Sequence, residues 1–287
     1  MFSTPSSPSH LSIIFLSTIL FIFINPSQSS IQSFIYDGCS QQKYTQGTPY
    51  ESNVNSLLNS LINSASYVSF NNLNSSVPGS TLTEVAYGLF QCRGDLRGSN
   101  CRDCVVGAVS QLGVLCGNST SGALQLEGCY VKYDSVSFVG VDDKTLVMKK
   151  CGPSISLDSE ELIPRDAVLG HLRVEEDYFR VSGSRNVQGV AQCMEDLSGD
   201  QCQDCLSEAI GRLKVECGPA MWGDIFLGKC YTRYFEQGAH SKTDNDEDEK
   251  TLAILIGLMS GVVLLIIFLS FLSKLVDNKV FHIAGGK

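Results

Sequence analysis

The chain has 287 residues, a length that allows one or two domains at roughly 150 residues each. Its 30 acidic and 21 basic residues give a formal net charge of −9. This balance argues against a nucleic-acid partner, because phosphates require a basic face. Hydrophobic residues make up 43% of the chain and charged residues 18%, which argues against simple disorder.

The first apolar run, Leu11–Ile24, lies near the N-terminus and holds 14 residues, whereas a membrane span needs about 20. Ser27 and Ser29 provide small residues at the two positions that a signal peptidase reads. The sequence therefore predicts a cleaved secretory signal peptide over residues 1–29. The alternative is an uncleaved N-terminal anchor, since only His10 precedes the run and no Lys or Arg does.

All 12 cysteines lie between this run and a second apolar run near the C-terminus, and their spacing repeats. The pattern C-x8-C-x2-C-x11-C-x12-C occurs twice at a constant offset of 101 residues. Gly, Gln, Asp, Leu and Tyr residues recur at the same offset, so the chain contains an internal duplication. Six cysteines per copy in a secreted protein indicate disulfides. The cysteines are Cys39, Cys92, Cys101, Cys104, Cys116 and Cys129, followed by Cys151, Cys193, Cys202, Cys205, Cys217 and Cys230.

The two copies define two cysteine-rich domains, over residues 30–140 and 145–240. The segment between them is short, so we expect the domains to touch. Three disulfides in about 100 residues could supply much of a domain's net stability, at about 2–4 kcal/mol each. The spacing alone leaves 15 pairings open in each domain.

Both copies combine helical and strand patterns. Apolar residues over 54–62 recur at helical spacing, and a second helix is predicted over 100–115. Its counterpart in the second copy is predicted over 200–215, with Asp200 as the N-cap. Alternation over 124–126 and 129–133 predicts antiparallel strands. The sequence therefore predicts an α+β module, repeated in tandem.

Several motifs allow a functional reading beside a structural one. The C-x2-C pairs Cys101–Cys104 and Cys202–Cys205 could bind zinc or form a redox dithiol, but six cysteines in a secreted domain fit disulfides better. His171 has no counterpart in the first copy and is predicted to lie on a helix surface. Trp222, the only tryptophan, is predicted to lie in the core or at the domain interface. No catalytic, cofactor-binding or metal-ligating residues are predicted.

Two N-glycosylation sequons are present, Asn74-Ser75-Ser76 and Asn118-Ser119-Thr120. Both lie in polar sequence that we read as loops facing the lumen. The sequence therefore predicts a glycan at Asn74, at Asn118 or at both.

The second apolar run, Leu252–Leu272, follows an acidic stalk over residues 241–251 and holds 21 residues without a charge. At about 1.5 Å per residue it would span about 30 Å, the thickness of a bilayer core. The tail, residues 273–287, carries more Lys than Asp, so the positive-inside rule places it in the cytosol. The sequence therefore predicts one transmembrane helix in a single-pass type I membrane protein.

A GxxxG motif, formed by Gly257 and Gly261, lies within this predicted span. Small residues at this spacing let two membrane helices approach closely. The motif therefore predicts helix packing and self-association in the membrane, although Gly is also common in membrane helices that do not pair.

The duplicated C-x8-C-x2-C pattern resembles the plant ginkbilobin-homologous, stress-antifungal cysteine-rich domain, over about residues 33–240. A signal peptide, two such domains, one span and a very short tail resemble the layout of the plasmodesmata-located protein family. The resemblance implies two helices packed on an antiparallel sheet of about five strands in each domain. It also implies the disulfide pairs Cys39–Cys116, Cys92–Cys101 and Cys104–Cys129, then Cys151–Cys217, Cys193–Cys202 and Cys205–Cys230.

The secreted ginkbilobin lectin of this family binds mannose through an Asn, an Arg and a Glu near its first and last cysteines. This chain keeps neither the Asn nor the Arg in either copy, so we predict no sugar-binding residues. The matching positions are Ser40, Ala123 and Asp134 in the first copy, and Gly152, Asp224 and Phe235 in the second.

The resemblance implies a non-enzymatic protein of the plasma membrane at plasmodesmata, with its N-terminal part outside the cell. Such a protein modulates cell-to-cell traffic, with callose deposition, defence signalling and viral movement proteins as associated processes and partners. Its expected partners are the membrane, itself or related family members, and an unidentified wall or protein ligand. The alternatives are a membrane-tethered carbohydrate-binding or antifungal module and a disulfide oxidoreductase, which would require reactive thiols.

Overall fold

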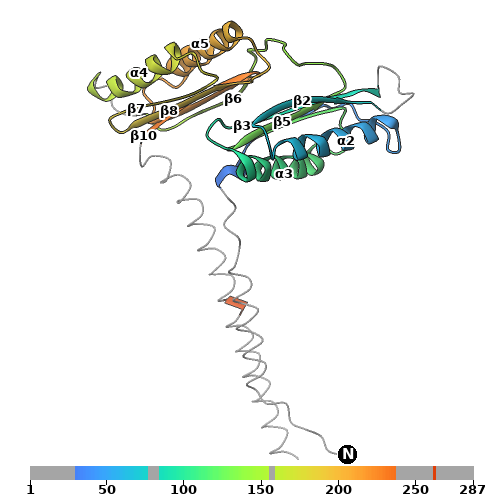
Figure 1. The fold of residues 1–287 in the computed structure, drawn as a ribbon. Coiled ribbons are helices and arrows are strands. Elements are labelled where there is room, and N and C mark those ends of the chain that lie inside the picture. The colour runs from blue at the N-terminus through green and yellow to red at the C-terminus, as the bar shows by residue number, and fades with distance from the viewer. Residues whose placement is uncertain (1–29, 77–83, 155–158, 237–260, 263–287) are drawn as a thin grey trace, which may run out of the picture.

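We describe a computed structural model of the chain over residues 30–76, 84–154, 159–236 and 261–262 (Figure 1). The two sequence repeats form two modules of the same topology, each a five-stranded antiparallel sheet with two α-helices on one face. The strand order is β1-β4-β5-β3-β2 in the first sheet and β6-β9-β10-β8-β7 in the second. The predicted α+β fold is therefore confirmed.

In the first module the chain forms a short 3-10 helix, then alternates strands and helices. The elements are η1 (Ser30–Gln32), β1 (Phe34–Cys39), α2 (Pro49–Ser64), β2 (Phe70–Ser75), β3 (Ala86–Cys92), α3 (Gly98–Leu115), β4 (Ser121–Leu126) and β5 (Cys129–Asp134). The second module repeats this order without the 3-10 helix. Its elements are β6 (Leu146–Cys151), α4 (Ser159–Val174), β7 (Phe179–Ser184), β8 (Val187–Cys193), α5 (Gly199–Glu216), β9 (Trp222–Leu227) and β10 (Cys230–Glu236).

The helices form where the apolar stripe predicts them. Val54, Leu57 and Leu61 of α2 are buried against the first sheet, at a spacing that places them on one helix face. The sheet makes room for this face at Gly88, where an added Cβ would lie 2.8 Å from a Leu57 methyl group. The same arrangement recurs in the second module, where Gly189 lies beneath Val168 and Leu172 of α4.

The structure corrects the predicted N-cap of α5. The helix begins at Gly199, and Ser198 is its N-cap, because the Ser198 hydroxyl accepts a hydrogen bond from the Gln201 backbone N–H. The Gln201 side-chain oxygen in turn accepts a hydrogen bond from the Ser198 backbone N–H, which completes a capping box. Asp200 lies instead in the first turn, where the positive end of the helix dipole stabilises its negative charge.

Six disulfides close the two modules, three in each, and pair the cysteines in the order that the family resemblance implied. The two cysteines of each C-x2-C motif bond to different partners, so neither motif is a dithiol pair. Most of these sulfurs lie inside the two hydrophobic cores, between helices and sheet.

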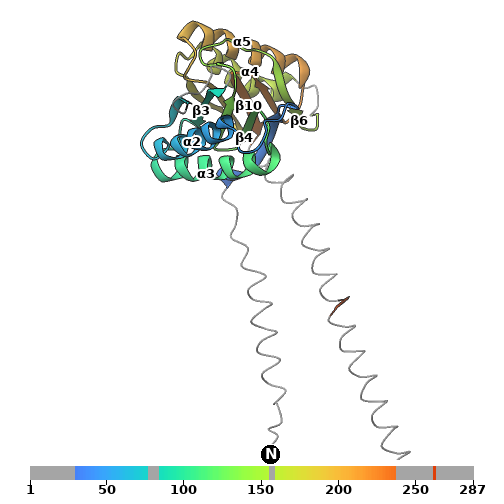
Figure 2. The same ribbon diagram turned by 90° about the vertical axis from the view of Figure 1, so that its right-hand side faces the viewer.

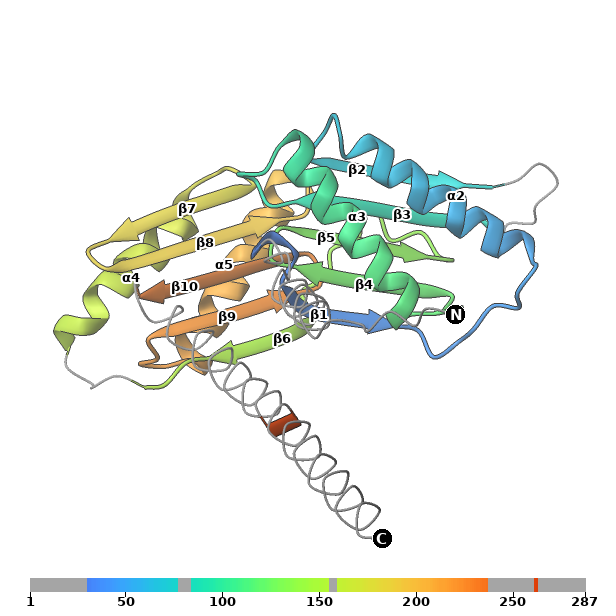
Figure 3. The same cartoon turned by 90° about the horizontal axis from the view of Figure 1, so that it is seen from below.

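The modules stack with their helices outermost. Figures 1 and 2 show α4 and α5 on one outer side and α2 and α3 on the other, so that the helix-free faces of the two sheets point inward. The two sheets are offset and overlap only in part. Seen from the side of α2 and α3, the second sheet extends beyond the first, and no helix of the described residues lies in front of that part (Figure 3).

Among the helices of the described residues, none is long and apolar enough to cross a membrane. The predicted span Leu252–Leu272 lies outside these residues, apart from Gly261 and Val262, which are helical. Gly257, the signal peptide, the stalk and the tail also lie outside them.

Candidate interdomain site

The two modules meet where β3 and β5 of the first sheet and β8 and β10 of the second reach their disulfide-bonded ends. In the strand register, Cys92 lies opposite Cys129 in the first sheet, and Cys193 lies opposite Cys230 in the second, although each is disulfide-bonded to another cysteine. A cavity of about 20 Å³ lies between these ends, lined by residues of both modules. This volume holds about one water molecule, so the cavity is too small for a sugar ring or a peptide side chain.

A reciprocal pair of glutamines joins the modules. Gln91 donates its side-chain N–H to the Cys193 carbonyl at 3.0 Å, and Gln192 donates to the Cys92 carbonyl at 3.0 Å. Their amide oxygens accept from the Glu195 N–H and the Tyr231 hydroxyl, at 2.9 and 3.0 Å. Both glutamines are buried. Because they stand 101 residues apart in the repeat, the interface has an approximate two-fold symmetry.

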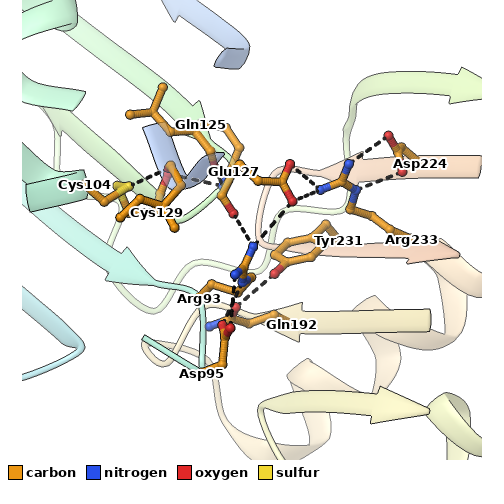
Figure 4. A network of polar contacts seen from close by, with 12 residues as sticks. Arg93, Asp95, Cys104, Gln125, Glu127, Cys129, Gln192, Asp224, Tyr231 and Arg233 are labelled. Carbon is orange, nitrogen blue, oxygen red and sulfur yellow. Dashed lines mark hydrogen bonds and ion pairs between the residues drawn. A yellow bond between two sulfur atoms is a disulfide. The ribbon is translucent and has the colours of Figure 1, made fainter. Parts of the chain in front are cut away.

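An ion-pair network runs beside the glutamines and breaks this symmetry (Figure 4). Arg233 donates to both carboxylate oxygens of Glu127 at 2.7 Å, across the interface. It also donates to Asp224 of its own module at 2.8 and 3.3 Å. On the first module, Arg93 pairs with Asp95 at 2.7 Å and approaches Glu127 at 3.5 Å.

The oppositely charged groups of this network stabilise one another's charged forms. Burial opposes the charge of Arg233, but the carboxylates of Asp224 and Glu127 outweigh it and raise the pKa of Arg233 above its usual value. A hydrogen bond from Arg93 lowers the pKa of Asp95, against the opposing effect of burial. The network therefore favours the charged forms of Arg233 and Asp95.

Aromatic rings complete the contact. Tyr36 of the first module meets Phe226 of the second edge-to-face, with ring centroids 5.6 Å apart. Phe226 in turn stacks on Tyr231 at 4.9 Å. Burial raises the pKa of Tyr36 and Tyr231 far above the usual value for tyrosine. These phenols therefore serve packing and hydrogen bonding, not proton transfer.

The linker between the modules is anchored in the same region. Lys229 pairs with Asp196 and donates to the Phe138 carbonyl at 3.1 Å. Asp196 also accepts from the Gly140 N–H at 2.9 Å, and the Phe138 ring lies 4.4 Å from the Lys132 ammonium group. These contacts tie both modules and the linker to one another.

The structure places the other predicted residues away from this site. His171 lies exposed on α4, as expected. Trp222 is half-buried on the helix-free face of the second sheet, over Gly152, and belongs to neither core cluster, so the prediction of a core position is wrong. Asn118 lies in a turn with φ of 60°, as a loop residue would. Asn74 lies on the edge strand β2, so the prediction of a loop there is wrong. Successive side chains of a strand point to opposite faces, and Asn74 is exposed where its neighbour Leu73 faces the core.

Neither a sugar site at Asp224 nor a metal site near Asp37 fits the geometry of the structure. Asp224, at one of the family's mannose positions, is engaged by Arg233. Among the described residues, the acidic and sulfur atoms of Asp37, Cys39 and Cys116 come within 4.8 Å of one another. Cys39 and Cys116 are bonded to each other, which leaves a single carboxylate and no set of metal ligands.

The interdomain ion pairs were missed from the sequence, although a signal was present. Arg233 stands where the first repeat has Lys132, and Asp224 stands where it has Ala123. These two positions are cross-strand partners in both modules. A joint departure at two paired positions indicates a new interaction in the second repeat.

Comparison with known proteins gives a consistent result. The family model described as salt stress response/antifungal matches residues 38–136 and 161–237. The chain is 50% identical to plasmodesmata-located protein 6 of Arabidopsis thaliana, over 90% of this chain and 95% of that protein. It is 52% identical to plasmodesmata-located protein 7 of the same plant, over 87% and 85%. Its fold matches the crystal structure of the tandem DUF26 ectodomain of the Arabidopsis thaliana cysteine-rich receptor-like protein PDLP5, with a TM-score of 0.67 and 46% identity, over 71% of this chain and 99% of that one.

Proposed function

Because this chain belongs to the salt stress response/antifungal family, and its close relatives are plasmodesmata-located proteins, we propose that it regulates cell-to-cell traffic at plasmodesmata. The observation that carries the proposal is the match to plasmodesmata-located protein 6 over 95% of that protein's length. A match of this extent is longer than the two modules together, so it includes sequence outside them.

The proposed topology is that of a type I protein of the plasma membrane. A signal peptide over residues 1–29 would direct the modules outside the cell, where their six disulfides can form. The apolar run Leu252–Leu272 would anchor them in the membrane.

The proposed mechanism is recognition without catalysis. The rigid tandem would bind a wall component or a protein outside the cell, and the span would hold the complex at the channel. Closure or opening of the channel would then follow through callose deposition or defence signalling by other proteins. A viral movement protein could use the same anchored protein as a docking partner.

A fluorescent fusion in plant cells tests the proposal. The full chain, tagged after Lys287, should form puncta at cell junctions, and its overproduction should change the spread of a mobile fluorescent protein between cells. A matched chain that ends at residue 240 should be secreted and should leave the spread unchanged. An even distribution of the full chain over the plasma membrane would refute the proposed location.

A further inference from the structure

A second, larger cavity lies at the end of the second module, away from the interdomain contact. The Cys193 and Cys230 ends of β8 and β10 meet the first module, whereas this cavity lies at the opposite ends of the two strands, beside Val187 and Glu236. Its volume is about 420 Å³, within the range of about 300–1,000 Å³ that is usual for small-molecule sites. The N-terminal part of α4, the turn between β7 and β8, and the adjoining ends of β9 and β10 form its walls.

The floor of this cavity is apolar. It is formed by buried side chains, those of Pro164, Val187, Ala220 and Tyr234. Val187 and Tyr234 belong to the second hydrophobic core, so the cavity lies on the helix-covered side of the sheet. Successive side chains of a strand point to opposite faces, so Phe235, at one of the lectin's sugar positions, points away from it. The cavity is therefore distinct from the sugar site of the ginkbilobin lectin.

One charged side chain lies among these apolar groups. The side chain of Arg165 is only 10% exposed. It donates to Asp166 at 3.0 and 3.2 Å and to the Gly218 carbonyl. Its charge and a hydrogen bond from it oppose the rise in the pKa of Tyr234 that burial causes, so the guanidinium also lies beside this phenol. Among the described residues, these partners use at most four of its five N–H donors, which leaves at least one donor for a ligand.

The first module has apolar side chains at the equivalent end. Val54 of α2 occupies the helix position of Arg165, because each stands three residues before the side chain that lies over the matching sheet glycine. Val54 and the nearby Tyr50 both belong to the first hydrophobic core. The Tyr50 hydroxyl donates to the Thr120 carbonyl at 2.6 Å, which holds its ring beside the start of β4. An apolar residue therefore satisfies the fold at this position, and folding alone does not require an arginine in the second module.

The charge around the cavity is positive, although the chain as a whole carries −9. Arg185, in the turn between β7 and β8, is exposed and forms no ion pair with the residues that the structure describes. Asp166 also faces Lys214 at 3.8 Å, so two cations share this one carboxylate. Glu236 accepts a hydrogen bond from Asn186. Within the described part of the chain, three cations therefore face two carboxylates here, which favours an anionic ligand.

We propose that this cavity binds a small amphipathic organic anion, an apolar ring or chain that carries one acid group. The apolar body would cover the buried floor, and the acid group would accept a hydrogen bond from Arg165, with Arg185 as a second cation at the rim. A neutral sugar fits less well, because its hydroxyl groups would lose water over an apolar floor without gaining partners. The site does not depend on the function proposed above.

Titration calorimetry of the full chain in mild detergent tests the proposal, with 2-naphthoate as the probe and 2-naphthamide as its neutral counterpart. Both probes partition into detergent, so the same titration of protein-free micelles is subtracted. We expect 2-naphthoate to bind at least about tenfold more tightly than 2-naphthamide, because a hydrogen bond to a charged group is lost in the amide. R165M keeps the length of the side chain without its charge and should abolish this preference. The matched control R212M removes an arginine that is paired with Glu208 on α5, and it should keep the preference.

Two further variants keep the test decisive if R165M does not fold. Arg185 is exposed, so R185Q should fold; it should weaken 2-naphthoate binding about threefold and leave 2-naphthamide binding unchanged. M221W places a larger ring at the half-buried wall and should weaken the binding of both probes about tenfold.

Equal affinities for the two probes in the unchanged protein would overturn the proposal, as would heats no larger than those of the micelles. An equal loss of preference in R212M, or unchanged 2-naphthoate binding in both R185Q and M221W, would also overturn it. None of these outcomes bears on the location at plasmodesmata, so the proposed function stands or falls separately.

Discussion

Replacement of Arg233 by methionine, which keeps the length of the side chain without its charge, tests the ion-pair network that joins the modules. Arg233 makes four hydrogen bonds, two to Glu127 and two to Asp224. In R233M, Asp224 would remain as a carboxylate with a side chain only 6% exposed, whereas Glu127, at 30%, can regain water. A buried charge that has lost its partner destabilises the folded state by about 3–5 kcal/mol. Because Glu127 can be hydrated in R233M, we expect a loss near the lower value.

A loss of about 3 kcal/mol lowers the melting temperature by about 6–12 °C for a protein of this size. The fluorescence of Trp222, the only tryptophan, reports unfolding of the second module directly, because it lies on β9 two residues from Asp224. The matched control is K149M. It breaks the pair with Glu216, whose side chains are 44% and 25% exposed, and should cost less than about 1 kcal/mol.

A double variant separates the stranded charge from the lost contacts. D224A/R233M removes the orphaned carboxylate and should melt above R233M, although it lacks the same bonds to Glu127. If R233M shifts the melting temperature no more than K149M does, or if the double variant melts below R233M, the reasoning from buried charge is refuted.

Three further predictions use the same protein. The free energy of unfolding should fall by about 1–3 kcal/mol in G189A, because the new Cβ would lie 2.5 Å from a valine methyl group of α4. The control G170A lies on open helix surface and should not be destabilised, so equal melting temperatures of the two variants would contradict the prediction. Burial raises the pKa of Tyr133 from 10.0 to about 12, so its contribution to stability is complete below pH 10 and is lost as the pH rises to 12. Chemical denaturation should show that Y133F lacks this part of the loss of stability. Parallel pH profiles of the free energy of unfolding for Y133F and the unchanged protein would disprove the prediction. Limited reduction should open Cys151–Cys217 first, because Cys151 is exposed, and peptide mass mapping that finds another pair alkylated earlier would reject this.

The local elements of the fold were predictable because their signals are local. The helix over 54–62 carries its own apolar stripe, and the strands over 124–126 and 129–133 carry their own alternation. The cap of α5 was misjudged because Ser198 and Asp200 are both good N-caps. The reciprocal bond between Ser198 and Gln201 decides between them, and the spacing S-x-x-Q could have indicated it.

The interdomain site was less predictable because its partners lie far apart in the sequence. Glu127 and Arg233 are separated by 106 residues, and no periodicity links them. The prediction of a core position for Trp222 failed for a related reason. A lone tryptophan in a small domain is most often buried, but Gly152 leaves an open backbone surface on which the indole can lie outside both cores.

A duplicated chain supplies its own comparison, because each module shows what the other needs merely to fold. Positions that stay the same at the offset of 101 residues, such as Gln91 and Gln192, maintain the disulfide-bonded scaffold and the symmetric part of the contact. Positions that change together on paired strands must serve something that only one module does. Arg233, positioned by Asp224, holds the two modules in one arrangement through its bonds to Glu127. The ion pairs that join the two modules therefore have their origin in the divergence of the second repeat.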